Sequence, residues 1–308
     1  MQVKGMKTVV CAVIDVGSNT IRMSVYKIEN GGFHVLFSKK ETAGLANYIL
    51  LRQMSPEGVR EAVDVLNSFK NVLKYIHVDE LHVFATASLR NIDNSAGVLS
   101  AIWRGTGFQV ELISGNREAE LSFAGANCEG PFSEGYLIDV GGGSAEVVSF
   151  SDMKPDFTAS IEIGSLNLYK SCVEKIWPKK KELDAINEKI SGVLSASSLP
   201  AEKKPVLICV GGTARSLRDL INGKNGSPKS NKAVSMEELS AMVRFLQEKN
   251  QEALDAVLKK CPDRIHTIVP GSMLIEALAK RFGTEKLYIS NYGIREGYLW
   301  KNVMKHST

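Results

Sequence analysis

The sequence lacks the features that mark membrane proteins, secreted proteins and zinc-binding domains. None of its apolar runs reaches the roughly 18 residues that a transmembrane helix needs. Its five cysteines are scattered, odd in number and without CxxC spacing, which favours reduced thiols in a cytoplasmic protein over a disulfide framework. The five histidines are dispersed, and none is paired at positions i and i+4 as a zinc-binding helix requires.

Two common catalytic signatures are also absent. The sequence has no GxSxG motif, which disfavours covalent serine catalysis, and no GxxxxGK[ST] motif, which disfavours P-loop chemistry. The formal net charge of +4 is compatible with an acidic substrate but does not indicate nucleic-acid binding. With 308 residues, 44% of them hydrophobic and 23% charged, the chain has the composition of a globular protein and the length for two domains.

One stretch combines the chemical groups that suit a phosphate with a divalent cation. The apolar run 136–140 carries Asp139, three glycines and Ser144 follow, and Glu146 lies at the start of a second apolar run. This order predicts a strand, a tight turn and a second strand. Glycines let the backbone approach a ligand and direct its N–H groups at an anion. Two carboxylates that bracket these donors therefore indicate a phosphate and cation site, although the GGGS turn alone fits a structural hairpin equally well.

The same pattern occurs a second time near the N-terminus. Asp15 ends an apolar run, the turn 17–20 carries hydroxyl groups, and another apolar run begins at Ile21. A supersecondary unit that recurs at a domain-sized interval predicts two similar domains rather than a solenoid with its short repeat. Two such hairpins that face each other would form a cleft with an anion cradle on each wall, which suits a chain of phosphates.

Alternating strands and helices predict an α/β protein. We place the first domain at residues 1–128 and the second at 129–296, and we expect the C-terminal helix 297–308 to pack back on the first domain. The helical region 263–282 is expected to break near Pro270. The other expected strands are 33–39, 81–85, 108–113, 157–163, 206–210 and 287–289. The other expected helices are 56–76, 95–104, a helix that contains Glu118, 164–177, 182–196, 214–220, and helices that run from 236 to about 259.

Three further sequence positions offer phosphate chemistry after predicted strands. Arg90 follows the strand 81–85 and could bind two phosphate oxygens, or it could be a surface arginine near a helix start. Glu118 falls in the first turn of a helix, where it could activate a water or simply stabilise the helix dipole. The turn 211–213 places helix N–H groups after a buried strand, which is typical both of an anion site and of an ordinary strand-to-helix turn.

Eight segments, in this order along the chain, resemble the exopolyphosphatase and guanosine-pentaphosphate phosphohydrolase family of the actin–sugar kinase–chaperone ATPase superfamily. The segments are IDVGSNTIRM, ATASLRNIDN, ISGNREAE, LIDVGGGSAEVV, SIEIG, GGTARSL, IVPG and SNYGIREG. The resemblance implies two ribonuclease-H-like, or actin-like ATPase, domains with the active site in the cleft between them.

The resemblance also implies a role for individual residues. Glu118 matches the catalytic glutamate that activates water, and Arg90 adds positive charge at the catalytic centre. Asp139 and Glu146 match the acids that hold Mg²⁺ (or Mn²⁺), and we expect Asp15 to belong to the same metal-binding set. The expected phosphate-binding residues are Gly17, Ser18, Asn19, Gly141, Gly142, Gly143, Ser144, Gly211, Gly212 and Thr213.

Three positions depart from the family pattern. Arg117 stands where the family often has Glu, Ala145 replaces the usual Thr, and Asn167 stands where many members have Arg. None of these changes removes Glu118 or the metal-binding acids, so we expect an active enzyme. The chain also lacks the additional helical domains of longer relatives, which predicts a preference for short polyphosphate chains.

The sequence therefore predicts a cytoplasmic, Mg²⁺-dependent exopolyphosphatase, a homodimer that binds neither nucleic acid nor membranes. The alternative substrate is guanosine pentaphosphate, from which the enzyme would remove the 5′-terminal phosphate. A sugar- or acetate-type kinase and an inactive polyphosphate-binding protein are less favoured, because Glu118 is retained with water as the implied acceptor.

Overall fold

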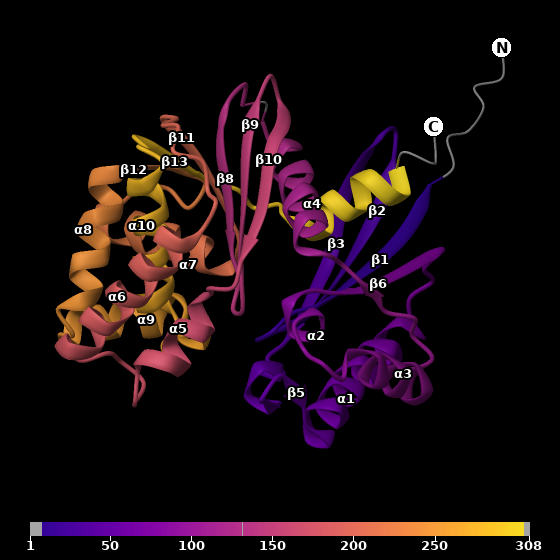
Figure 1. Cartoon of the computed structure of the whole chain (residues 1–308). Helices are drawn as coiled ribbons and strands as arrows, with labels where there is room; N and C mark the ends of the chain where they lie inside the picture. Colours follow the sequence, from indigo (N-terminus) through magenta and orange to yellow (C-terminus); the bar gives the residue numbers. More distant parts are fainter. Residues whose placement is uncertain (1–7, 131, 305–308) are drawn as a thin grey trace, which may run out of the picture. The chain divides into compact units, whose positions relative to one another are not determined.

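The computed structural model describes residues 8–130 and 132–304 (Figure 1). The chain forms two compact units, Met1–Arg117 together with Tyr298–Thr308, and Glu118–Gly297. The chain therefore passes between the units twice, once within the helix α4 (Gly115–Asn127) and once within the short helix α11 (Ile294–Tyr298). The sequence prediction sets its corresponding limits at residues 128 and 296.

The first unit is built on a five-stranded sheet with the order β3-β2-β1-β6-β7. The first three strands are antiparallel neighbours, and β6 and β7 continue the sheet in parallel with β1. The last of them is shorter than the predicted strand 108–113, because Phe108 packs into the hydrophobic core instead of pairing in the sheet. The strands are β1 (Val9–Val16), β2 (Ile21–Glu29), β3 (Gly32–Glu41), β6 (Glu80–Ala85) and β7 (Glu111–Leu112).

Both faces of this sheet are covered. On one face, Ile14 of β1 packs with Leu66 and Phe69 of the helix α1. On the other face, the ring of Tyr298 stacks on Phe84 of β6 with 5.1 Å between the ring centroids. The remaining elements are η1 (Leu45–Tyr48), the small hairpin β4 (Ile49–Leu50) and β5 (Gln53–Met54), α1 (Pro56–Leu73), α2 (Ala87–Arg90), α3 (Ser95–Thr106) and the C-terminal π-helical turn η3 (Leu299–Val303).

The second unit repeats this strand order. Its sheet has the order β10-β9-β8-β11-β13-β12, so the first five strands follow the same sequence of antiparallel and parallel pairings as the first unit. The short antiparallel strand β12 is an addition at the edge. The structure thus confirms the predicted α/β fold with two similar units. The strands are β8 (Gly135–Val140), β9 (Ala145–Ser151), β10 (Lys154–Ile161), β11 (Val206–Val210), β12 (Ala233–Ser235) and β13 (Lys286–Ile289).

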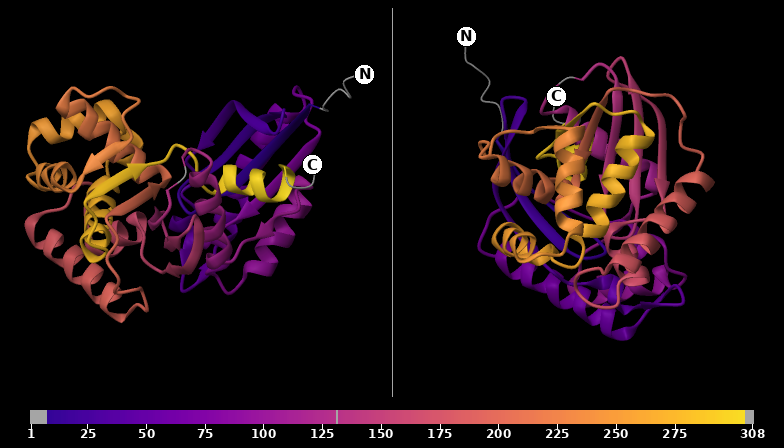
Figure 2. Two further views of the ribbon diagram at one scale, coloured as in Figure 1. Left: turned by 90° about the horizontal axis from the view of Figure 1, so that it is seen from above. Right: turned by 90° about the vertical axis from the view of Figure 1, so that its left-hand side faces the viewer.

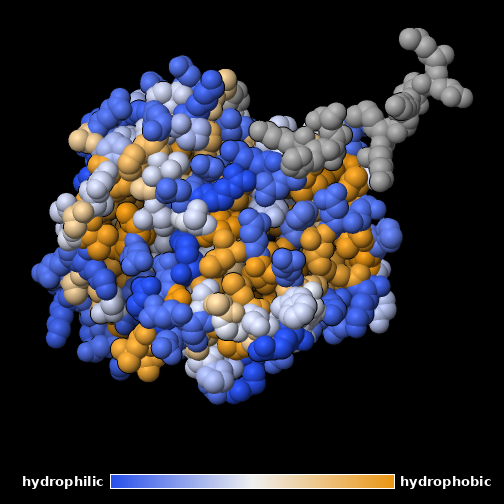
Figure 3. All heavy atoms as spheres, turned by 45° about the vertical axis from the view of Figure 1, so that its right-hand side comes forward, coloured by the Kyte–Doolittle hydropathy of each residue, from blue (hydrophilic) through white to orange (hydrophobic). Residues whose placement is uncertain are grey.

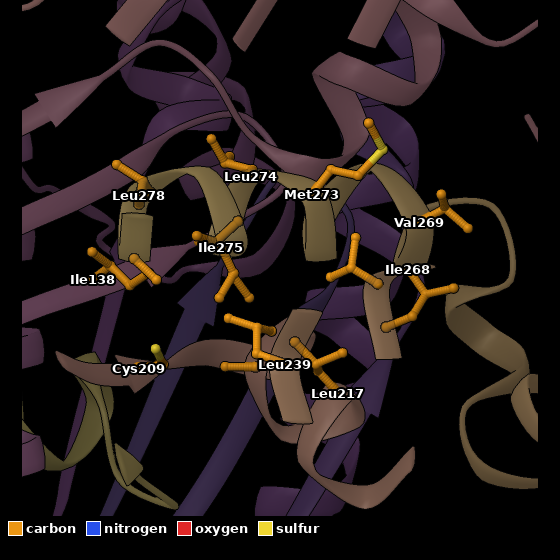
Figure 4. Packing of buried hydrophobic residues seen from close by; sticks show 14 of the residues in the cluster. Ile138, Cys209, Leu217, Leu239, Ile268, Val269, Met273, Leu274, Ile275 and Leu278 are labelled. Carbon is orange, nitrogen blue, oxygen red and sulfur yellow. The ribbon is translucent and has the colours of Figure 1, made fainter. Parts of the chain in front are cut away.

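Helices cover both faces of the second sheet. Phe123 of α4 packs against Leu137 and Val148 on one face. The other helices gather over the opposite face (Figure 2), where Ile138 of β8 lies beside Ile275 of the central helix α10 (Figure 4). These helices are α5 (Ser165–Cys172), α6 (Lys180–Ala196), α7 (Gly211–Asn225), α8 (Met236–Gln247), α9 (Gln251–Lys260) and α10 (Ile268–Arg281), with the turn η2 (Pro262–Arg264) before α10.

Some predicted helix limits are wrong, and each error has a physical cause. The predicted break near Pro270 is absent, because Pro270 lies in the first turn of α10, where a backbone N–H needs no acceptor within the helix. The helix predicted over 214–220 is longer, because α7 begins already at Gly211 and continues to Asn225, where Gly226 ends it in the left-handed conformation. The predicted helix 164–177 ends already at Cys172, where Val173 becomes extended.

The surface carries apolar side chains among polar ones. Figure 3 shows this mixture on the face that it presents. The most exposed large apolar side chains among the described residues are Tyr75, Leu51 and Leu50. Over the same described ranges, no helix has both the length and the apolar character needed to cross a bilayer.

Candidate active site

The two predicted turns have the same geometry. The N–H of Gly17 donates to the carbonyl of Thr20 over 3.1 Å, and the N–H of Gly141 donates to the carbonyl of Ser144 over 3.0 Å. In the strands that flank these turns, Asp15 lies opposite Arg22, and Asp139 lies opposite Glu146. The repeat that the sequence pattern predicts is therefore a repeat of hydrogen bonding and of strand register.

Both turns present backbone donors without a protein acceptor. Across the described ranges, the N–H groups of Ser18, Asn19, Gly142 and Gly143 donate to no backbone or side-chain oxygen. The carbonyl groups of the same turns are engaged, since Ser18 accepts from Ala46 and Gly142 accepts from the first turn of α5. Each turn is therefore held in place by its carbonyls while its amides remain available for an anion.

Asp139 is held at the end of β8 by contacts from two helices. The hydroxyl of Ser122 on α4 donates to Oδ2 of Asp139 over 2.8 Å. The first residue of α7, Gly211, lies so close that a Cβ there would be 2.6 Å from Oδ1 of Asp139. Burial raises the pKa of Asp139, and the Ser122 hydrogen bond together with the charges of Arg215 and Arg295 opposes this rise.

Glu146 is a buried carboxylate beside Asp139. Its side chain is 1% exposed, and Oε1 accepts hydrogen bonds from Ser144 over 2.7 Å and from Ser160 over 2.8 Å. Because Glu146 and Asp139 are directly opposite in the hairpin, their side chains lie on the same face of the sheet. This is the face that α4 covers, since Leu137 and Val148, each two residues away along the same strands, point to the same face and pack against α4.

Glu118 reaches the same face from the first turn of α4. It stands four residues before Ser122 and therefore lies on the same side of the helix, one turn away from the hydroxyl that binds Asp139. The side chain of Glu118 is buried, with 9% exposure. The second unit thus brings Glu118, Asp139 and Glu146, which are dispersed in the sequence, to one face of one sheet.

Three arginines of the second unit that the sequence reasoning missed add positive charge. The side chain of Arg264 lies against the backbone of Gly212, at the point where a Cβ would otherwise stand, and burial lowers its pKa. Arg215 and Arg295 lie near enough to Asp139 to favour its ionised form. Arg215 belongs to the segment GGTARSL and Arg295 to the segment SNYGIREG, so the sequence did carry a signal for these two charges. Nothing in the sequence around Arg264 indicates its position in the site.

The departures from the family pattern make defined contacts. Nδ2 of Asn167 donates to the carbonyl of Gly143 over 2.8 Å and so secures the glycine turn. Ala145 is fully buried at the first position of β9. Within the first unit, Nη2 of Arg117 donates to Oδ1 of Asn302 over 2.9 Å, which joins α4 to the C-terminal segment.

The other predicted site residues lie in the first unit. Asp15 is at the carboxyl end of β1, directly before the turn 17–20. Arg90 ends the helix α2, and its Nη1 donates to the carbonyl of Ile113 over 3.0 Å. A site that these residues share with Glu118 and Asp139 stays a prediction.

The residues of the second unit suit a hard divalent cation and a phosphate. Two carboxylates on one face supply the oxygen ligands that Mg²⁺ and Mn²⁺ prefer, and a cation would offset the cost of burying a charged Asp139. The available amides and the N-terminal residues of α7, Gly211, Gly212 and Thr213, can receive phosphate oxygens. This combination is the one that phosphoryl transfer needs, namely fixed donors, cation ligands and a carboxylate for a water.

Comparison with known proteins agrees with this chemistry. The sequence model of the Ppx/GppA phosphatase family matches residues 24–306. Exopolyphosphatase 1 of Mycobacterium tuberculosis is 25% identical over 300 residues, which cover 94% of this chain and 87% of that protein.

Solved structures of this family have the same fold. The structure of an exopolyphosphatase from Cytophaga hutchinsonii matches with a TM-score of 0.86 at 23% identity, and covers 96% of this chain and 98% of that one. A Ppx/GppA family member from Aquifex aeolicus matches with a TM-score of 0.79 at 22% identity, and covers 98% of this chain and 100% of that one.

Proposed function

Because the chain belongs to the Ppx/GppA phosphatase family, we propose that it hydrolyses the terminal phosphoanhydride bond of inorganic polyphosphate and prefers short chains. The observation that supports this most directly is the placement of Glu118, Asp139 and Glu146 on one face of the second sheet. A turn with available amides lies between the two strands that carry Asp139 and Glu146. Relatives that are named exopolyphosphatases support the choice of substrate.

The three carboxylates have two different roles in the proposed reaction. Glu118 orients the attacking water and takes its proton, which makes the water a better nucleophile. Asp139 and Glu146 would hold Mg²⁺ (or Mn²⁺), which supplies charge neutralisation at the oxygens of the transferred phosphoryl group. The serine hydroxyls on Asp139 and Glu146 keep both carboxylates oriented.

The turns bind the phosphate chain. Amides of Gly142 and Gly143 donate to the oxygens of the terminal phosphate, and the amides of Ser18 and Asn19 together with Arg90 are the phosphate-binding groups that the first unit offers. Attack by water forms a new P–O bond, and the bond to the bridging oxygen breaks. The products are inorganic phosphate and a polyphosphate that is one phosphate unit shorter. The leaving group is already a good one, so positioning and charge account for most of the rate.

The alternative substrate is guanosine pentaphosphate, which the resemblance of the eight sequence segments implies beside polyphosphate. The bond that breaks and the roles of Glu118, Asp139 and Glu146 would be the same. The kinase and the inactive binding protein remain less favoured, because all three carboxylates are present. The homodimer and the cytoplasmic location stay predictions.

Phosphate release by the purified protein tests the proposal. Polyphosphates of several lengths, guanosine pentaphosphate and ATP are compared with and without Mg²⁺. We expect Mg²⁺-dependent release that is fastest from short polyphosphates. Faster release from guanosine pentaphosphate would establish the alternative, and ATP consumption that depends on an added acceptor would establish the kinase. No release from any of these substrates would leave only the inactive binding protein.

A further inference from the structure

Three side chains of different chemistry meet on the sheet of the first unit. Cys11 of β1 lies opposite Glu80 of the parallel strand β6, and His82 is the next residue of β6 on the same face. The sulfur of Cys11, a carboxylate oxygen of Glu80 and a ring nitrogen of His82 all lie within 4.8 Å of one another. Nothing in the proposed hydrolysis uses these residues.

This cluster is separate from the candidate active site. Cys11 precedes Asp15 by four positions on β1, and a strand rises about 3.3 Å per residue, so roughly 13 Å separates Cys11 from the end that carries Asp15 and the turn 17–20. Glu80 is the first residue of β6, whereas Arg90 follows the opposite end of that strand. The cluster therefore lies at the amino end of β6.

The three groups match the preferences of zinc. A thiolate, an imidazole and a carboxylate are all common zinc ligands, with bond lengths of about 2.0–2.3 Å, which place tetrahedral ligands roughly 3.4–3.6 Å apart. In the structure Nε2 of His82 is 3.2 Å from Oε2 of Glu80. Shifts of about 1 Å in these side chains would therefore complete the geometry. The exposed Glu80 provides the route by which an ion can enter.

The groups around the cluster orient the imidazole of His82. They also favour the protonated thiol of Cys11, so that a bound cation is needed to convert it to a thiolate. The ring of Tyr298 lies 5.4 Å from the ring of His82, and its hydroxyl donates to Glu111 over 2.7 Å, which fixes the aromatic contact. Burial, with a smaller contribution from the nearby Glu80, raises the pKa of Cys11 to about 12, so the sulfur is a neutral thiol by itself. A metal ion that binds such a thiol displaces its proton.

We propose that Cys11, Glu80 and His82 form a binding site for a thiophilic divalent cation of the zinc class, with a water as the fourth ligand. Binding replaces the His82–Glu80 hydrogen bond and the S–H bond of Cys11 with three metal–ligand bonds, and it releases one proton from the thiol. The bound ion links β1 to β6. The proposal is independent of the proposed hydrolase activity, because its residues and its readout are different.

Titration of the whole protein with Co²⁺ tests this site, with the protein freed of any affinity tag. Excess Mg²⁺ is present so that it occupies Asp139 and Glu146 in place of Co²⁺. Mg²⁺ prefers oxygen ligands and does not compete with Co²⁺ for a thiolate. We expect one Co²⁺ per chain with the sulfur-to-cobalt charge-transfer absorption that a carboxylate site cannot produce. Zn²⁺ should then displace the Co²⁺ and abolish the absorption, since zinc binds such sites more tightly.

Variants assign the ligands. Cys11→Ser should lack the charge-transfer absorption, whereas Cys128→Ser, which removes an exposed thiol of the second unit, should keep it. Glu80→Gln and His82→Gln should weaken Co²⁺ binding by at least about tenfold, because even an outer partner of a metal ligand contributes about 10–100-fold.

The absence of the absorption in the parent protein would overturn the proposal, as would its persistence in Cys11→Ser. Circular dichroism checks the fold of each variant. If the buried Cys11→Ser variant does not fold, the two variants at the less buried positions 80 and 82 decide, and unchanged Co²⁺ affinity in both would also overturn the site.

Discussion

At the scale of single residues, the candidate site depends on the groups that contact its two acids, Asp139 and Glu146. Asp139 is half-buried, and this burial raises its pKa, whereas one hydroxyl and two arginines act in the opposite direction. Glu146 is supported by two serine hydroxyls. These contacts prepare both groups for a cation, which is the partner that would favour the charged form most strongly.

Replacing Glu118 by Gln should remove the general base and leave the shape of the side chain. We expect kcat to fall by about 10²–10⁴-fold, which is the usual size of a general-base contribution, while polyphosphate binding is retained. Steady-state phosphate release and equilibrium binding measure the two effects. Glu120→Gln on the same helix is the matched control and should keep near-normal turnover. Near-normal turnover in Glu118→Gln would refute the role given to Glu118.

Replacing Ser122 by Ala should raise the pKa of Asp139 further, because the hydroxyl no longer offsets the effect of burial. The charged form of Asp139 is the one that binds Mg²⁺, so the acidic limb of the pH–activity profile should move to higher pH. Activity should recover at higher pH or higher Mg²⁺ concentration. The control Ser171→Ala removes a hydroxyl that bonds the Asn167 carbonyl and should leave the profile in place. An unshifted acidic limb in Ser122→Ala would contradict this account of Asp139.

At the scale of elements, close approach of backbones positions the site. Gly125 of α4 faces Gly293, directly before α11, and a Cβ at Gly125 would collide with the Gly293 carbonyl. Gly297 in turn lies against the backbone of Leu121. These contacts join the segment that carries Arg295 to the helix that carries Glu118 and Ser122. The distances within the site therefore depend on the absence of a side chain at Gly125 and Gly297.

Replacing Gly125 by Ala should therefore destabilise the protein by about 1–3 kcal/mol, the usual cost of overpacking, because the new methyl group meets backbone rather than a movable side chain. Gly192→Ala in α6 is the matched control, since a Cβ there meets nothing within 4 Å. The control should be neutral or more stable by about 0.5–1 kcal/mol. Urea unfolding measures both variants, and equal stability of the two would contradict the proposed contact.

At the scale of the whole molecule, two units with the same strand order carry the same turn in the same place. Their paired residues differ in one informative way, since Asp15 faces Arg22 whereas Asp139 faces Glu146. The second turn therefore has two acids and suits a cation, while the first combines one acid with a positive charge and suits the phosphate itself. This difference supports separate roles for the two turns, with cation binding at the second and phosphate binding at the first.

Removal of divalent metal should stop turnover of the whole enzyme without unfolding it. Both acids are already held by serine hydroxyls and sheet pairing, so the fold does not need the ion. Dialysis against a chelator followed by addition of Mg²⁺ or Mn²⁺ tests this, with phosphate release and circular dichroism as readouts. Full turnover in the metal-free protein would contradict the role of Asp139 and Glu146.

The sequence alone determined the features that depend on neighbouring residues. The two hairpins, the capped start of α1 at Ser55 and the capping box at Ser235 follow from patterns a few residues long. The family resemblance then indicated Glu118, Asp139 and Glu146 as a set. Only the tertiary structure decided that Ser122 binds Asp139, that Arg264 lies on Gly212, that α10 runs through Pro270, and that Cys11 meets His82. Such contacts join residues that are far apart in the chain, so their geometry is set by how helices and strands pack rather than by any local pattern.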